Sequence, residues 1–447
     1  MTQDLDAHLK ELDNQIRAGK SEYVRNQLGT LKPHSVPREY AASLAKLARR
    51  ANLPELALQI LHPIVRSKKI LQPKASGKEI AEYAAALAFL GASYEAYGLA
   101  KKVNPSEVPE TLLYQAFALF AQWSYKEAVD PLMTYIHSKN VAPYDRLVGK
   151  VNLAAALLSQ RIHRDAEEVL NDVIRESKEQ GYQLLLGNAL QMLAENNIQL
   201  GNYHNAEKLL YEAQAAIHDS SSPYELFIRK WRAFLSIKSK GVSEHTLSEL
   251  HQVRYQAQDR RHWETIRDCD RFEALATGNK KIFLKVYFGT PFKRFRKYLL
   301  ADFGQKTHLP DFYFWGRLPE GEANEGVMEL DLQSASISVR NASGVLSRLN
   351  NPLEVGGSLH LLLLALCSDF YCPLSLRVLY ATLFPDEFYD PETSDIRIRS
   401  FVKELSQWLA TANLPIEVIE EERHFFRLAF KGPSAVKVPL QHPLLKR

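Results

Sequence analysis

The first 279 residues place apolar side chains at the spacings of amphipathic helices, and a small residue returns once in each pair of helices. The recurring position follows a short turn each time, and the steps between copies are 33, 39, 32, 38 and 40 residues. It is occupied by Val24, Ala57, Ala96, Ala128, Ala166 and Ala206. Because such intervals are typical of helical-hairpin repeats, the pattern predicts an all-α array of stacked hairpins over residues 1–279.

The most regular copy runs from Ala189 to Ala213. It places Gly201 and Tyr203 at the turn, and Ala206 and Ala213 where neighbouring helices approach. This copy resembles the tetratricopeptide repeat. The resemblance implies a solenoid whose concave surface binds a peptide or another protein. The other copies vary in length and in their glycine and aromatic positions, so a plain α-helical domain without true repeats remains the alternative.

The pattern changes between residues 280 and 326, which we expect to form a connector. Ile282–Phe288 is apolar and β-prone and predicts a strand. Residues 292–303 predict a short helix rich in aromatic and basic side chains, and residues 310–316 predict another strand. Residues 318–326 are acidic and contain glycine, which predicts a linker.

Beyond the linker, the pattern predicts short strands and three helices in a domain spanning residues 327–431. Two alternating strands are expected within residues 328–339 and two more at residues 416–419 and 425–430, with helices at residues 359–367, 374–384 and 395–412. The third helix has one apolar face, formed by Ile398, Val402, Leu405 and Leu409. Three helices closed by a β-hairpin predict a small α+β winged helix-turn-helix domain, followed by a C-terminal tail at residues 432–447.

This segment resembles the winged-helix effector domain of OmpR/PhoB-type response regulators. The resemblance rests on the four aliphatic residues of the third helix and on Phe426–Leu428 at the end of the last strand. It implies that the third helix enters the major groove of double-stranded DNA and that the hairpin contacts the adjacent backbone or minor groove. The residues then expected to contact DNA are Arg397, Arg399, Ser400, Lys403, Arg423 and His424.

Charge is distributed unevenly over these two segments. Residues 280–306 hold eight bases and one acid, the most basic window of the chain. Possible phosphate contacts in this window are Lys293, Arg294, Arg296 and Lys297, and a solvated amphipathic helix is the alternative for the same residues. Residues 359–431 hold seven bases and eleven acids, a net charge of −4. Glu404 and Ser406 stand where the family usually has arginines, and Phe425 where it usually has glycine. Because phosphate neutralisation supplies most non-specific DNA affinity, this balance also suits a protein-binding surface.

Composition and motifs narrow the possible functions. The chain is 46% hydrophobic and 10% aromatic, enough for real cores. The cysteines at positions 269, 367 and 372 are too few for a disulfide framework and lack zinc-binding spacing. Met1–Asp6 is acidic rather than signal-like, and no apolar run reaches the roughly 18 residues of a membrane helix. A cytoplasmic protein without a membrane partner is expected.

The sequence contains no phosphate-binding, dinucleotide-binding, zinc-protease or nucleophile-elbow motif. We therefore expect no enzyme activity, no cofactor and no metal. The preferred interpretation is a bacterial transcription regulator whose helical repeats bind a protein or peptide signal and whose winged helix binds double-stranded DNA. The alternative is a non-enzymatic interaction scaffold whose winged helix binds protein. The sequence leaves the oligomeric state open.

Overall fold

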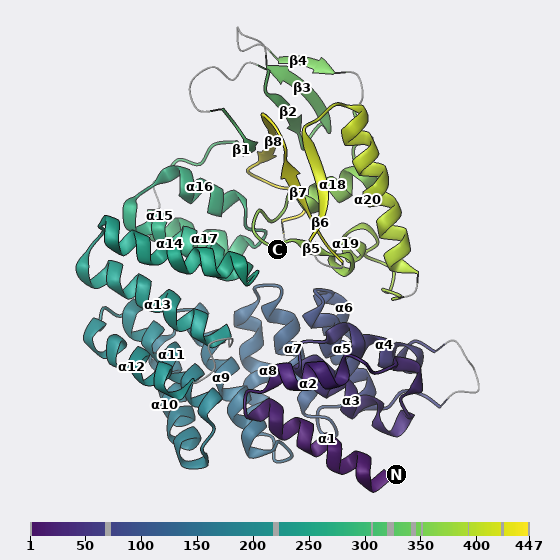
Figure 1. Ribbon diagram of the computed structural model, residues 1–447, viewed down its shortest axis with the longest axis vertical. Coiled ribbons are helices and arrows are strands. Elements are labelled where there is room, and N and C mark those ends of the chain that lie inside the picture. The colour runs from purple at the N-terminus through teal and green to yellow at the C-terminus, as the bar shows by residue number, and fades with distance from the viewer. Residues whose placement is uncertain are drawn as a thin grey trace. The chain divides into compact units, whose positions relative to one another are not determined.

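The computed structural model describes residues 2–67, 73–217, 223–304, 307–319, 326–340, 346–349, 352–391, 393–421 and 424–445. Contacts between residues divide the chain into two compact units, Met1–Gln256 and Ala257–Arg447. Each unit is described separately (Figure 1). The predicted division at residue 279 remains a prediction, because the contacts group the last helices before that point with the C-terminal unit.

The N-terminal unit is built from helices joined by short turns, drawn from purple to teal in Figure 1. They are α1 (Thr2–Arg17), α2 (Ser21–Leu28), the 3-10 turn η1 (Pro33–Ser35), α3 (Arg38–Arg50), α4 (Pro54–Val65), α5 (Gly77–Phe89), α6 (Ser93–Ala100), α7 (Glu110–Phe120), α8 (Tyr125–His137), α9 (Pro143–Ser159), α10 (His163–Gln180), α11 (Gln183–Gln199), α12 (Tyr203–Ala216), α13 (Pro223–Lys240) and α14 (Glu244–Asp259). Successive pairs such as α3 with α4 and α11 with α12 pack as helical hairpins.

The predicted small-residue positions mark the same place in every hairpin. Each of the six is the fourth residue of the second helix, and each is no more than 1% exposed. A side chain of this size lets the two helix backbones approach closely. The first helices also contact one another, α3 with α5, α5 with α7, α9 with α11 and α11 with α13. Repeated hairpins in two layers confirm the predicted helical-repeat region, with the first helices forming the inner layer.

The turns explain why the repeats look irregular in sequence. One residue between the two helices has a positive φ angle in each hairpin, which is the conformation that ends the first helix. It is glycine at Gly91 and Gly201, but Asn52, Trp123 and Arg161 adopt it elsewhere, with φ between 58° and 62°. The backbone geometry therefore persists where the glycine is absent.

The C-terminal unit begins with helices and continues into two small sheets (Figure 1). Its helices are α15 (Trp263–Thr277), α16 (Lys280–Phe288), α17 (Lys293–Phe303), α18 (Ser358–Leu366), α19 (Leu376–Leu383) and α20 (Ser394–Thr411). Its strands are β1 (Phe312–Arg317), β2 (Met328–Asp331), β3 (Ser336–Arg340), β4 (Leu346–Leu349), β5 (Leu374–Ser375), β6 (Ile416–Glu421), β7 (Phe425–Phe430) and β8 (Ser434–Pro439). The sheets have the orders β1-β8-β2-β3-β4 and β5-β7-β6.

Two predicted elements are wrong. Ile282–Phe288 lies in helix α16 instead of a strand, because the Asn279 side chain accepts hydrogen bonds from the Lys281 and Ile282 amides and so starts a helix there. The fully buried side chains of Phe283, Val286 and Phe288 then outweigh their β-propensity. The predicted C-terminal tail contributes β8, whose Ala435, Val436 and Val438 are fully buried.

The three helices α18, α19 and α20 pack on one another, and β6 and β7 form the predicted hairpin. The apolar face of α20 is buried as its spacing predicted. Ile398 and Leu405 are fully buried, Leu409 is 1% exposed and Val402 is 9% exposed. This burial fixes which residues of α20 remain at the surface.

Candidate functional site

The inner layer of the N-terminal unit presents a stripe of partly exposed residues. Helix α11 is flanked by α9 and α13 in its own layer and by α10 and α12 in the other. Its remaining accessible side chains therefore face the inner surface. They recur on one side of each helix, at Leu184, Asn188 and Glu195 on α11 and at Val148, Asn152, Ala155 and Ser159 on α9. We call these seven residues the inner stripe.

Two amide side chains lie within the inner stripe. The Asn152 Nδ2 group donates a hydrogen bond to the Val148 carbonyl at 2.8 Å. Asparagines Asn196 and Asn197 of α11 are buried instead. The Asn196 side chain contacts His163 Nδ1 at 2.7 Å and the His163 carbonyl at 3.2 Å, and so joins α11 to α10. On α11 the accessible amide of Asn188 is thus separate from the buried amides of Asn196 and Asn197.

A buried polar triad links the inner layer nearer the N-terminus. Arg49 of α3 donates to Glu82 of α5 at 2.9 Å and to the Tyr114 hydroxyl of α7 at 3.0 Å, and Tyr114 donates to the second oxygen of Glu82. All three side chains are less than 9% exposed. Burial and the nearby Glu82 carboxylate raise the pKa of Tyr114 well above its ordinary value. The triad joins three successive first helices and leaves no donor for a ligand on Tyr114.

On α20, the predicted DNA contact Arg397 is held by two side chains of the preceding segment. Its guanidinium donates to Glu387 Oε2 at 2.7 Å and lies over the Phe384 ring, 3.4 Å from the ring centroid. A hydrogen bond from Tyr380 and the Arg397 ion pair lower the pKa of Glu387. Arg397 is therefore neutralised at the surface where the sequence predicted a free cation.

Arg399 is neutralised by the hairpin. It makes two hydrogen bonds of 2.8 Å to Glu420 on β6 and lies 3.3 Å from His424 Nδ1. The Arg399 hydrogen bonds hold the pKa of Glu420 at about 2, against the opposing effect of burial. The structure thus brings the two predicted DNA contacts Arg399 and His424 together around an acid rather than on an open basic surface.

The remaining predicted DNA contacts differ in their surroundings. Ser400 donates to Glu404 at 3.1 Å on the same helix, and Lys403 is exposed. Arg423 lies outside the described residues. A row of exposed residues follows the outer side of α20 at spacings of four, three and four, namely Ile396, Ser400, Lys403 and Gln407. Apart from Lys403, this row is uncharged.

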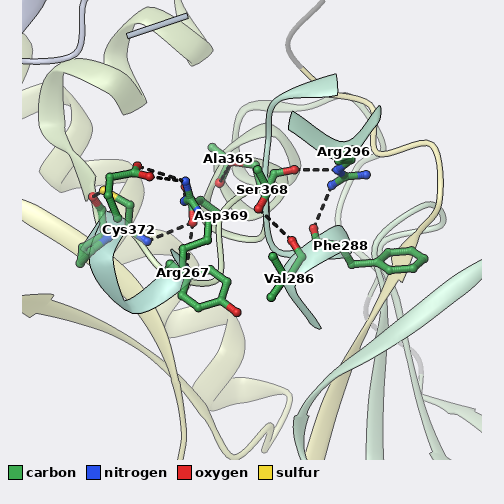
Figure 2. Close-up of polar contacts among 12 residues, drawn as sticks. Arg267, Val286, Phe288, Arg296, Ala365, Ser368, Asp369 and Cys372 are labelled. Atoms are coloured by element: carbon green, nitrogen blue, oxygen red, sulfur yellow. Dashed lines mark hydrogen bonds and ion pairs between the residues drawn. The ribbon is translucent and has the colours of Figure 1, made fainter. Parts of the chain in front are cut away.

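The basic residues of α17 do not form one surface. Lys293 and Lys297 are exposed and Arg294 is half-buried, but Arg296 is only 4% exposed. Arg296 donates to the carbonyls of Thr290 at 2.7 Å and Phe288 at 2.9 Å (Figure 2). Burial lowers its pKa to about 10. The prediction of a phosphate contact at Arg296 is therefore corrected, because its donors hold the loop after α16.

Sequence reasoning missed a buried ion pair in the same unit (Figure 2). Arg267 of α15 is 1% exposed and donates to Asp369 Oδ2 at 2.5 Å, while Asp369 Oδ1 accepts from the Tyr371 and Cys372 amides at 2.9 and 3.0 Å. Burial opposes the charge of Arg267, but Asp369 and Glu264 raise its pKa overall. Neither residue lies in a motif that predicts such a contact.

A second contact also joins α15 to the segment that follows α18. The Tyr371 hydroxyl donates to Asp270 Oδ2 at 2.8 Å, and Lys285 of α16 donates to the same oxygen at 2.7 Å. Asp270 is 4% exposed, so both donors compensate its burial. These contacts fasten the segment after α18 to α15 and α16 within the C-terminal unit.

Within the described ranges, no three His, Cys, Asp or Glu side chains are placed to hold a metal ion. No helix in the described part of the chain is both long and apolar enough to cross a membrane.

The sequence matches no family model and no curated protein. Several solved structures show limited similarity to this chain, among them two Rap structures and one with tetratricopeptide-like repeats. A Rap protein complexed with competence and sporulation factor has 12% identity and a TM-score of 0.46, covering 68% of this chain and 89% of that one. The apo form of RapI has 13% identity and a TM-score of 0.38, covering 62% and 84%.

The third structure is a Podosopora anserina putative kinesin light chain with tetratricopeptide-like repeats, at 19% identity and a TM-score of 0.28, covering 50% of this chain and 96% of that one. At these values the similarities assign neither a family nor a function to this chain. The helical-repeat architecture of the N-terminal unit follows from its own hairpins.

Proposed function

We propose that this chain is a non-enzymatic regulator whose N-terminal repeats bind a peptide or protein segment along the inner stripe. The observation that carries the proposal is the pair of accessible amides, Asn152 and Asn188, set beside the apolar Val148 and Leu184 on adjacent helices. An amide side chain both donates and accepts hydrogen bonds, which matches the N–H and C=O groups of a peptide backbone. The neighbouring aliphatic residues supply contacts for its side chains.

A phage-displayed library of random peptides, selected on the full-length chain, tests this proposal. Selected peptides are expected to lose at least tenfold in affinity for an Asn188→Arg variant, because the longer cation occupies the stripe. Glu207→Arg on α12 is the matched control, since it adds the same side chain at an exposed position of the second layer. Failure to select any peptide, or equal loss in both variants, contradicts the proposal.

For the C-terminal unit we propose a winged helix-turn-helix of the OmpR/PhoB type. The order of elements supports this assignment. Strands β1 to β4 precede α18, β5 lies between α18 and α19, and α20 is followed by the β6-β7 hairpin. The buried apolar face of α20 and the pairing of β5 with β7 complete the arrangement. Strand β8, inserted between β1 and β2, adds to the first sheet.

DNA binding through α20 is the second candidate function, and the exposed row on that helix favours it. Lys403 is a phosphate contact in this proposal, Gln407 is suited to adenine and Ile396 to a thymine methyl group. The ion pairs of Arg397 and Arg399 are at the surface, where such pairs contribute about 0–1 kcal/mol, so phosphates can replace Glu387 and Glu420. If DNA phosphates do not replace Glu387 and Glu420, the two ion pairs leave α20 with a largely neutral surface, which suits protein binding better than DNA binding.

Fluorescence anisotropy with a mixed-sequence DNA duplex separates these alternatives. We expect binding at low salt and at least a tenfold loss in an Arg399→Ala/Lys403→Ala variant, together with a shallower salt dependence. Lys208→Ala on α12 is the control for the loss of a surface charge. If the unaltered protein does not bind the duplex at low salt, the scaffold interpretation replaces DNA binding.

A further inference from the structure

Helix α1 carries one apolar stripe whose residues are set four, three and four positions apart. The stripe consists of Leu5, Leu9, Leu12 and Ile16, and the last three are between 1% and 8% exposed. The opposite side of α1 is polar and exposed, as at Lys10 and Asn14. The helix contacts α2 and α3. It is therefore a small amphipathic helix laid on the repeat array by its apolar side.

The C-terminal end of α1 reaches a second helix of the inner layer. Asp13 accepts from Arg17 at 2.7 Å and also from Arg50 at the end of α3. The Arg17 guanidinium lies over the Tyr144 ring of α9, 4.5 Å from its centroid. Tyr144 in turn meets Tyr182, at the start of α11, edge to face at 5.0 Å. We call Asp13, Arg17, Arg50, Tyr144 and Tyr182 the clasp.

The position of the clasp is unusual for a first hairpin. Helices α5 and α7 stand between α3 and α9 in the order of the array, yet one turn of α1 contacts both α3 and α9. Figure 1 shows α1 crossing the N-terminal unit in this direction. A hairpin stacked only on its neighbour cannot make both contacts. Helix α1 therefore crosses the inner layer, and its end lies at the beginning of the two helices that carry the inner stripe.

We propose that α1 is an intramolecular occupant of the inner surface, and that the partner recognised there is an amphipathic helix with the same four-three-four apolar spacing, which displaces α1. This rests on the proposed peptide-binding function and specifies its ligand. A helix seated in a groove by such a stripe is a common mode of peptide recognition. An occupant in cis is present at high effective concentration, so it suppresses weak ligands and admits those that bind better.

The energetics of the clasp suit displacement. Arg17 and Asp13 retain 32% and 26% side-chain exposure, and an ion pair of this kind contributes little to stability. The Gly19 turn between α1 and α2 has a φ of 85° and no neighbour within 4 Å of its missing side chain. Release of α1 also uncovers the buried Leu9, Leu12 and Ile16, so only a ligand that covers the same apolar surface can displace the helix.

The test uses the full chain and a fluorescein-labelled peptide with the sequence of Thr2–Arg17. Three forms of the protein are compared by anisotropy. One is unaltered, one carries Leu12→Asp and Ile16→Asp to release α1, and one is locked by a bismaleimide between Arg17→Cys and Tyr144→Cys in a Cys372→Ser background. The released form is expected to bind the peptide at least tenfold more tightly than the unaltered protein, and the locked form to bind at least tenfold more weakly.

The controls keep the outcome decisive. A peptide with serine in place of Leu9, Leu12 and Ile16 is expected not to bind, and Lys10→Asp, on the exposed side of α1, is expected to leave the unaltered affinity unchanged. Amide hydrogen exchange measures the release of α1 independently of peptide binding. In the unaltered protein the α1 amides are expected to exchange faster than those of α11. In the released form the α1 amides are expected to exchange at the rate of an unfolded chain, while the α11 amides stay protected.

The outcomes also separate this inference from the proposed function. If the released form binds library-selected peptides at the inner stripe but not the α1 peptide, the inference is overturned and the peptide-binding function stands. If it binds neither while α11 remains protected from exchange, both fail. Equal affinity of the locked and released forms for the α1 peptide overturns the inference as well.

Discussion

The two units join their helices by different chemistry. In the N-terminal unit the recurring contact is a small residue, the fourth of each second helix, buried to 1% exposure or less. In the C-terminal unit distant segments are joined by buried charges, as in Arg267 with Asp369, and by stacked rings, as in Trp315 with Phe370 at 4.3 Å. The small-residue contact is uncharged and returns in each hairpin, whereas a buried charge pair belongs to one place and depends on both partners, as Arg49 with Glu82 also does in the N-terminal unit.

This difference determines how each kind of contact responds to substitution. Enlarging a small residue pushes two helices apart at one hairpin, and the array can adjust locally because each repeat contacts mainly its neighbours. Removing one member of a buried charge pair leaves the other uncompensated at low dielectric. Substitutions that remove one partner of a buried charge pair, such as Arg267 with Asp369, are therefore expected to have the largest single effects.

Replacing Arg267 by alanine is expected to have the largest effect. The buried Asp369 carboxylate then lacks its partner, and the free energy of unfolding of the C-terminal unit should fall by about 3–5 kcal/mol. Urea unfolding followed by tryptophan fluorescence measures the change. Arg397→Ala, which removes an exposed pair, is the matched control and should cost about 0–1 kcal/mol. If the double variant Arg267→Met/Asp369→Leu is no more stable than Arg267→Ala, the uncompensated charge is not the cause.

A pH effect of intermediate size is expected from His442, which is 4% exposed. Burial and the charge of Arg296 lower its pKa to about 4 from an ordinary value near 6.5. Between these values the unfolded chain binds a proton that the folded chain excludes, so stability falls as pH is lowered from 6.5 to 4. The slope from this group is at most about 1.4 kcal/mol per pH unit. His442→Gln should flatten the profile in this window, and an unchanged difference between the two proteins across it would refute the assignment.

In the N-terminal unit, Gly187→Ala tests the close packing of α11 on α12. The added carbon would lie 2.4 Å from Ile217 Cγ1, so the hairpin must open and stability should fall by about 1–3 kcal/mol. Gly98→Ala in α6 is the matched control, because nothing lies within 4 Å of that position. The control should gain up to about 1 kcal/mol from helix propensity. Thermal unfolding by circular dichroism compares the two, and equal effects would show that close approach is not what Gly187 provides.

The smallest change is expected at the surface of α20. Arg399→Ala should alter stability by less than about 1 kcal/mol, because its pair with Glu420 is exposed. The pair contributes above the ordinary pKa of a glutamate and is lost as pH falls through the lowered pKa of Glu420, about 2. NMR titration of the Glu420 carboxyl group should show its pKa rising toward 4.3 in the variant. A pKa that stays near 2 would show that another group lowers it.

The features predicted from the sequence are those set by local periodicity. The small-residue positions of the hairpins and the apolar face of α20, including Ile398 and Leu405, follow from spacing alone, and both are found in the structure. The contact between Arg267 and Asp369 joins residues 102 positions apart, so no local pattern could reveal it. Helix α16 was wrongly predicted as a strand from its β-prone sequence, because the Asn279 cap and tertiary burial outweigh that local preference.

The candidate sites divide in the same way. The surface residues of α20 could be predicted, because they are the residues that do not belong to its buried apolar face. Their pairing could not, because Glu387 and Glu420 come from a loop and a strand outside the helix. The inner stripe was predicted only as a concave surface, since the exposure of Asn152 and Asn188 depends on which neighbouring helices cover the rest of α9 and α11.

Strand β8 has a consequence for how the protein is made. It lies between β1 and β2, pairing Arg317 with Ser434 on one side and Met328 with the same residue on the other. During synthesis, β1 and β2 leave the ribosome long before their common neighbour exists, and their edges stay unpaired until residues 434–439 follow. Exposed edges of this kind are prone to aggregate. The C-terminal unit is therefore expected to be the part of a nascent or prematurely terminated chain that chaperones bind.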